Sequence, residues 1–131
     1  MTKSDWMDLT VLERKKYNFL SEVMDLSKQL GEAMDRNDDV SIRMLIAMRQ
    51  EPLLKLEELK HVTELKKAEL SPEGRERVSA LGQGAVPRGE EETTYQNQAG
   101  SARRLLERIV ELDERLNRRM GGKDSFYAQK K

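Results

Sequence analysis

The sequence predicts an all-α fold: an antiparallel bundle of three long helices plus one short helix, followed by a flexible C-terminal tail. Apolar residues recur at alternating spacings of 3 and 4 over long stretches, which is typical of a helix that lies along another helix. Charged residues make up 37% of the 131 residues and aromatic residues 5%, so we expect a thin core between helices. Residues 1–121 are predicted to form the bundle domain and residues 122–131 the flexible tail.

The first two long helices are expected over about 11–37 and 40–70. Residues 35–39 between them are rich in Asp and Asn, which form turns and cap helices. Because this connection is short, the two helices must be antiparallel neighbours. Pro52 lies within the second helix, but the apolar spacing continues on both sides of it, so we expect a kink rather than a break.

The remaining elements are marked by helix start and stop signals. Ser71, Pro72 and Glu73 provide a serine cap, a proline at the first helical position and an acid in the first turn of a short helix that ends at Gly82. Residues 82–89 contain three glycines and a proline and are predicted to be a loop. The last helix is expected over about 90–120, and we expect it to pack along both of the other long helices.

The last helix carries the most regular apolar seam of the chain, formed by Ala102, Leu105, Ile109, Leu112 and Leu116. Charged residues, among them Asp113, fill most of the other positions, and Glu107, Glu111 and Glu114 are interpreted as parts of a solvated face. Beyond the stop at residues 121–122, Phe126 and Tyr127 form an aromatic pair in the tail. Such a pair is expected to dock on the bundle or on another protein.

Other classes of function find little support in the sequence. The net charge is zero, whereas nucleic-acid-binding proteins usually carry a basic excess. There is no cysteine, which excludes a disulfide, a cysteine nucleophile and a thiolate metal site. No run approaches the roughly 20 apolar residues of a membrane span, and the first residues do not form a signal peptide. We expect a cytoplasmic protein without nucleic-acid partners, membrane insertion or catalytic activity.

Metal and catalytic sites are also not expected. Asp35, Asn37 and Asp39 match the first three ligand positions of a calcium loop, but Val40 replaces its glycine and Ile46 replaces its last acidic ligand. His61 is the single histidine and lies at the edge of an apolar face. The prediction is therefore that the chain uses no metal, no other cofactor and no catalytic residue.

Two further features concern packing. Trp6, near the start of the chain, is expected to pack against the bundle. The seven methionines fit either of two interpretations, gap filling in a thin core or an adaptable binding surface.

The order of these elements resembles the FlgN type of flagellar export chaperone. The first helix ends in an acidic turn (LGEAMDRNDDV), and the second carries a leucine-rich run beside a basic residue (MRQEPLLKLEEL). A glycine-containing gap and a long final helix follow (LLERIVELDERLNRRM), and the tail has a Ser-x-Tyr-like element at residues 125–127. The resemblance covers roughly residues 9–127 and is shared in part with the related FliT-type chaperones.

The resemblance implies an export chaperone without a cofactor. Such a protein binds amphipathic terminal helices of the flagellar hook-associated proteins of the hook–filament junction, prevents their premature association and delivers them to the type III export apparatus. It implies that the client lies on Leu105, Leu106, Ile109, Val110, Leu112 and Leu116. In the family an aromatic residue of the tail contacts the export gate, which matches Tyr127, next to Phe126. The alternatives are a FliT-type chaperone for another flagellar client and a self-associating coiled coil, such as a homodimer, that uses the same seam.

Overall fold

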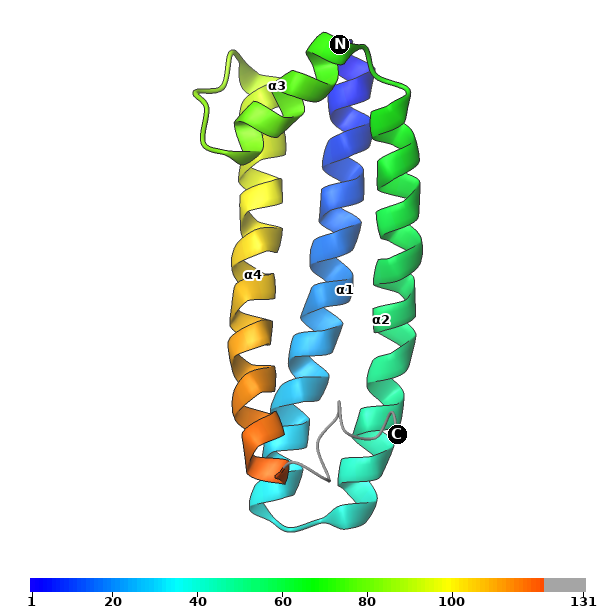
Figure 1. Cartoon of the computed structure of the whole chain (residues 1–131), viewed down its shortest axis with the longest axis vertical. Helices are drawn as coiled ribbons and strands as arrows, with labels where there is room; N and C mark the ends of the chain where they lie inside the picture. Colours follow the sequence, from blue (N-terminus) through cyan, green and yellow to red (C-terminus); the bar gives the residue numbers. More distant parts are fainter. Residues whose placement is uncertain (122–131) are drawn as a thin grey trace.

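A computed structural model of the chain describes residues 1–121, which form four helices and their connections (Figure 1). The helices are α1 (Lys3–Asp35), α2 (Asp39–Ala68), α3 (Pro72–Gly82) and α4 (Glu90–Met120). Residues 1–121 contain no strand, so the prediction of an all-helical bundle is confirmed. The predicted tail, with Phe126 and Tyr127, lies outside the described residues.

The helix α1 is the central element (Figure 1). It packs along α2 on one side and along α4 on the other, while α3 crosses the end of the molecule beside the start of α4. The three long helices meet where α1 and α2 are joined, in a cluster of buried residues comprising Leu30, Ala33, Leu45 and Leu116. The helix α4 packs along α1 over most of its length and reaches α2 where α1 and α2 are joined, through the Leu116 cluster and the ion pair between Arg49 and Asp113.

Residues near the start of α1 contact residues near the start of α4, and residues near the end of α1 contact residues near the end of α4. The rings of Trp6 and Tyr95 lie 5.5 Å apart, near the first turns of the two helices. At the opposite end, Arg119 Nη2 lies 2.6 Å from Asp35 Oδ1. The two helices therefore run in the same direction, and α2 runs in the opposite direction from α1 (Figure 1).

The helix α1 begins at Lys3, not near residue 11 as the apolar spacing predicts. Its first turn is fixed by a capping box: the Asp5 N–H donates to Thr2 Oγ1 at 3.1 Å, and the Thr2 N–H donates to Asp5 Oδ2 at 3.0 Å. This added stretch buries Trp6 and Leu9. The prediction that Trp6 packs against the bundle is thereby confirmed, while the predicted start of the helix is wrong.

Two local signals are confirmed. Pro52 lies inside α2, which continues through it from Asp39 to Ala68, so the proline does not break the helix. Ser71 caps α3 as predicted, because its Oγ accepts a hydrogen bond from the Gly74 N–H at 3.1 Å.

Arg77 and Gln96 attach the glycine-containing loop 83–89 to the neighbouring helices. Arg77 Nη2 donates to the Val86 carbonyl at 2.7 Å and forms an ion pair of 2.6 Å with Glu92 in α4. Gln96 Nε2 donates to the carbonyls of Leu81 and Ala85, both at 2.9 Å. The Arg77 guanidinium holds the pKa of the Glu92 carboxyl below its ordinary value.

Gly31 offers a simple test of the α1–α4 contact. A methyl group at this position would lie 3.4 Å from Cδ2 of Leu116, which is an ordinary van der Waals contact. A glycine inside a helix costs about 1 kcal/mol relative to alanine. We expect Gly31→Ala to raise the free energy of unfolding by about 0.5–1 kcal/mol. Urea denaturation measures this, and a loss of stability would show that the two helices lie closer than the structure has them.

Asp5 also connects the start of α1 to the end of α2. Lys66 Nζ lies 3.0 Å from Asp5 Oδ1 and 3.2 Å from Asp8 Oδ2. The Thr2 N–H and then Lys66 donate to the Asp5 carboxylate, and together they lower the pKa of Asp5 from 3.8 to about 2. The hydrogen bonds that Lys66 donates to Asp5 and Asp8 raise the pKa of Lys66. Folding therefore favours the ionised form of Asp5.

This pKa shift predicts a pH-dependent contribution to stability. Because the folded-state pKa lies below the ordinary value, the contribution is present above pH 3.8 and is lost as the pH falls towards 2. We expect Asp5→Asn to lower Tm at pH 7 and to approach the wild-type Tm near pH 2. Thermal unfolding monitored by circular dichroism across this range measures the difference. Glu107→Gln on the exposed side of α4 is the control, and a constant difference between wild type and Asp5→Asn at every pH would contradict the prediction.

Candidate helix-binding groove

An open groove lies over α1, between α2 and α4. Its volume is about 420 Å³. The helix α1 supplies Glu13, Lys16 and Leu20, while α4 supplies Leu106. The wall from α2 consists of Leu56, Glu57, Leu59, Lys60, Thr63, Glu64 and Lys67. The groove lies where α2 and α4 both pack on α1 and remain apart from each other.

The apolar part of the groove comes from all three long helices. Leu20 and Leu59 are buried at its base and belong to the packing between helices. Leu106 forms the α4 side and is 39% exposed. It follows Leu105 in the sequence and is therefore rotated about 100° around the helix from the buried seam. An apolar side chain of a bound partner could contact both the base and this exposed wall.

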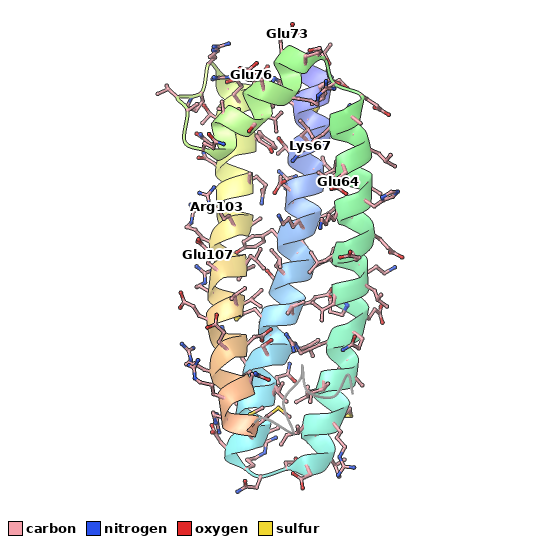
Figure 2. All side chains as sticks on the ribbon, in the orientation of Figure 1. Glu64, Lys67, Glu73, Glu76, Arg103 and Glu107 are labelled. Carbon is pink, nitrogen blue, oxygen red and sulfur yellow. The ribbon has the colours of Figure 1, made fainter. Side chains whose placement is uncertain are left out.

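The rim of the groove carries both signs of charge, from Lys16, Lys60 and Lys67 and from Glu57 and Glu64. Figure 2 labels Glu64 and Lys67 on the α2 edge, and shows Arg103 and Glu107 on the outer side of α4. Glu13 adds a carboxylate at the base and is 9% exposed. Burial, together with the negative charge of Glu13, raises the pKa of Tyr95 to about 12. This mixture of charge suits the flanks of an amphipathic helix.

A buried polar layer ties the three long helices together two turns beyond Leu106. Arg49 Nη2 in α2 lies 2.6 Å from Asp113 Oδ2 in α4, and the two side chains are 7% and 14% exposed. Ser27 Oγ in α1 donates to the other oxygen of Asp113 at 3.4 Å. Asp113 therefore differs from Glu107 and Glu114 of the same helix, which are exposed. The layer fixes the position of α2 relative to α4 where the groove ends.

The structure separates the six predicted client-binding residues into two sets. Leu105, Ile109 and Leu116 are buried against α1, and Leu112 is half-buried beside two of the core clusters. Leu106 and Val110 are 39% and 47% exposed and lie one turn apart on α4. A partner can reach these two residues without displacing α1. The sequence alone could have predicted which residues are exposed. Leu106 and Val110 do not belong to the seam, whose residues recur at alternating spacings of 3 and 4.

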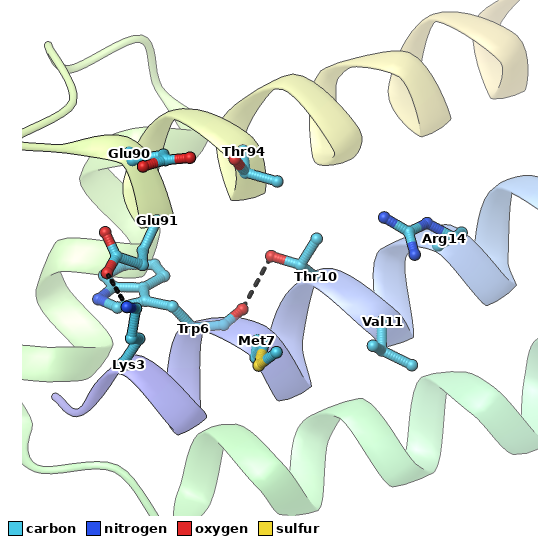
Figure 3. A pocket seen from close by; sticks show the side chains of 9 residues that line it. All are labelled: Lys3, Trp6, Met7, Thr10, Val11, Arg14, Glu90, Glu91 and Thr94. Carbon is cyan, nitrogen blue, oxygen red and sulfur yellow. Dashed lines mark hydrogen bonds and ion pairs between the residues drawn. The ribbon is translucent and has the colours of Figure 1, made fainter.

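A second hollow of about 560 Å³ lies between the first turns of α1 and α4 (Figure 3). It is lined by Trp6, Met7, Val11, Glu91 and neighbouring residues. Lys3 lies 3.9 Å from Glu91 across its rim, and Thr10 Oγ1 donates to the Trp6 carbonyl at 2.8 Å (Figure 3). None of the six predicted client-binding residues lines this hollow. The groove between α2 and α4 is therefore the candidate site.

The described helices also bear on metal binding and membrane insertion. Residues 1–121 contain no group of three His, Asp or Glu side chains placed to hold a metal ion. Among the four helices, none has both the length and the apolar character that a membrane span requires.

The chain was also compared with protein-family models, curated proteins and solved structures, and no match was found.

Proposed function

We propose that this protein is a helix-binding export chaperone of the flagellar type. The observation that carries the proposal is the groove between α2 and α4, with its apolar base, the exposed Leu106 wall and a rim of mixed charge. An amphipathic helix can place its apolar side chains on such a base and its polar flanks against the rim. Binding of this kind needs no cofactor.

The resemblance of the sequence to FlgN-type chaperones supports a narrower proposal. In it, the chain is an antiparallel bundle of three long helices with the short α3, and it acts in the cytoplasm. Its clients are terminal helices of hook-associated proteins of the hook–filament junction. The chaperone covers their apolar faces, which prevents premature association, and delivers them to the type III export apparatus. FliT-type chaperones serve other flagellar clients by similar means, so the identity of the client distinguishes the two.

The burial of the α4 residues assigns them different roles in this proposal. Leu106 and Val110 contact the client directly, because both are exposed. Leu105, Ile109, Leu112 and Leu116 hold α4 against α1 and thereby shape the groove. A client that is disordered when free must be ordered on binding, at a cost of about 2–5 kcal/mol. This cost favours the reversible binding that release at the export apparatus requires.

The direct experiment is a titration of fluorescently labelled peptides that contain the terminal helices of the junction proteins from the same organism. We expect saturable binding to the full chain, and an affinity at least about tenfold lower for Leu106→Asp because a charge then faces the apolar base. Glu107→Ala, one residue away on the outer side of α4, is the matched control and should bind as wild type does. Equal affinities for all three proteins would refute binding in this groove.

The tail forms a separate part of the proposal. We propose that Phe126 and Tyr127, which lie outside the described residues, dock on the export gate. A chain that ends at Gly122 is expected to keep its fold and its affinity for client peptides, and to lose capture of export-gate components. Loss of client binding in the shortened chain would instead assign the tail to the client site.

A further inference from the structure

The outer side of α2 carries a second heptad-like stripe that faces away from the core. Seven exposed residues follow one another at spacings of 4, 3, 4, 3, 4 and 3, namely Met44, Met48, Glu51, Lys55, Glu58, Val62 and Leu65. The four apolar members are 49–55% exposed. Single exposed apolar residues are normal, but a stripe at this spacing is the pattern by which one helix lies along another. In residues 1–121, no other element of the chain covers this stripe.

The order of residues within the stripe favours one direction and one register for pairing with a second copy. The stripe is apolar at both ends and charged in its middle. In a parallel pair with matched register, Glu51 would face Glu51 and Lys55 would face Lys55, and like charges would repel. In the antiparallel register that places Met44 opposite the other copy's Val62, Glu51 faces the other copy's Lys55, Met48 faces Glu58, and Leu65 lies beyond the paired residues. The two-fold symmetry of such a pair forms each of these contacts twice.

The surface beside the stripe favours the same antiparallel register. A groove of about 440 Å³ between α1 and α2 borders the stripe at Met48 and Glu51. Glu22 and Asp25 line it together with Glu51, and its lining contains no basic residue. The register that places Lys55 of the second copy opposite Glu51 brings an ammonium group to this acidic groove. Within one chain, Lys55 lies 3.9 Å from Glu58, and both side chains are more than half exposed, so Lys55 is accessible to a second copy.

We propose that two copies of this chain associate through the outer stripe of α2, with the two α2 helices antiparallel. The stripe extends over about 32 Å of helix, measured at 1.5 Å per residue. It lies on a different side of α2 from Leu56, Leu59 and Thr63, which line the groove proposed for the client. The dimer therefore leaves both client grooves open, and the association does not depend on the proposed chaperone function.

The test is a charge exchange at the centre of the stripe, read by sedimentation velocity of the full chain over a range of concentrations. We expect wild type to form a dimer, and Glu51→Lys and Lys55→Glu each to weaken it by about tenfold or more, because each single change creates two like-charge contacts. The double variant Glu51→Lys/Lys55→Glu restores opposite charges between positions 51 and 55, but it brings a carboxylate towards Glu22 and Asp25, so it should associate more tightly than either single variant and less tightly than wild type. Circular dichroism establishes that all variants keep their helix content.

The outcomes of this test separate the dimer from the client site. Glu107→Lys on α4 and Leu106→Asp in the client groove are expected to leave the dimer unchanged. A wild-type chain that stays monomeric at its highest soluble concentration would overturn the proposal, and so would a double variant that associates as weakly as the single variants. Client-peptide binding by Glu51→Lys should equal that of wild type, so failure of the dimer and failure of the chaperone function give different results.

Discussion

Ile109→Asp is expected to lower the free energy of unfolding by at least ~4 kcal/mol, because it places a charge in the core between α1 and α4. Ile109 is 4% exposed and lies in the cluster formed with Leu20, Val23 and Ala102. The substitution removes this apolar contact and surrounds a carboxylate with apolar side chains. Because domains are stable by only about 5–15 kcal/mol in total, we expect much of the variant to be unfolded.

The measurement for Ile109→Asp is urea and thermal unfolding followed by circular dichroism. Leu106→Asp is the matched control, since it introduces the same charge one turn earlier on the same helix at a residue that is 39% exposed. The control is expected to cost about 1 kcal/mol or less. The face of α4 that packs on α1 would be assigned wrongly if Ile109→Asp were as stable as wild type. The same would follow if Leu106→Asp lowered the free energy of unfolding as much as Ile109→Asp does.

Breaking the ion pair between Arg49 and Asp113 is expected to have a similarly large effect. Asp113→Asn keeps the shape of the side chain but removes the charge opposite a guanidinium that is 7% exposed. Removing the charge of one partner of a buried ion pair costs about 3–5 kcal/mol. Replacing both members, as in Arg49→Met/Asp113→Leu, is expected to cost much less, because neither desolvated charge remains.

A double-mutant cycle from urea unfolding measures the coupling of this pair. Arg119 and Asp35 provide the control, because their atoms lie at the same 2.6 Å but their side chains are 45% and 68% exposed. Arg119→Met is therefore expected to cost about 1 kcal/mol or less. Burial would be shown not to strengthen the pair by two results together. Arg49→Met and Asp113→Asn would each cost as little as Arg119→Met, and the cycle would show no coupling between positions 49 and 113.

The buried pair also bears on the candidate site. Asp113 lies on α4 two turns from Leu106, and Arg49 lies on α2, so their ion pair connects the two helices that border the groove. A variant that loses this pair is expected to hold α2 and α4 less firmly in relation to each other. We therefore expect Arg49→Met/Asp113→Leu to retain client-peptide binding better than Asp113→Asn does, because the double change keeps an apolar contact between the helices.

The helix boundaries could be predicted where the sequence carries a strong local signal. The serine cap and proline at residues 71–72, the glycine at 82 and the start near residue 90 all match the structure. The predicted start of α1 is wrong because it follows the apolar spacing and not the capping pair Thr2 and Asp5. Both kinds of signal lie in the sequence, and a cap fixes a helix end more closely than the apolar spacing does.

The roles of individual apolar residues could be predicted less well. On α4 the seam residues Leu105, Ile109 and Leu116 are buried as a regular apolar stripe predicts. On α2, apolar residues occur around much of the helix, and of these Leu45 and Leu59 are buried while Met44, Met48, Val62 and Leu65 are exposed. The sequence indicates that α2 is a helix with more than one apolar side, but it does not indicate which side meets α1.

By itself the sequence therefore determined the all-helical class, the order of the four helices and most of their ends. These depend on interactions between residues a few positions apart, namely caps, turn residues and apolar spacing. The tertiary structure alone decided that α2 and α4 both pack along α1 and meet each other near Arg49, that Asp113 is half-buried beside Arg49, and that Leu106 faces an open groove. Those features depend on the angle at which α2 and α4 are arranged around α1, which is set by contacts between residues far apart in the chain.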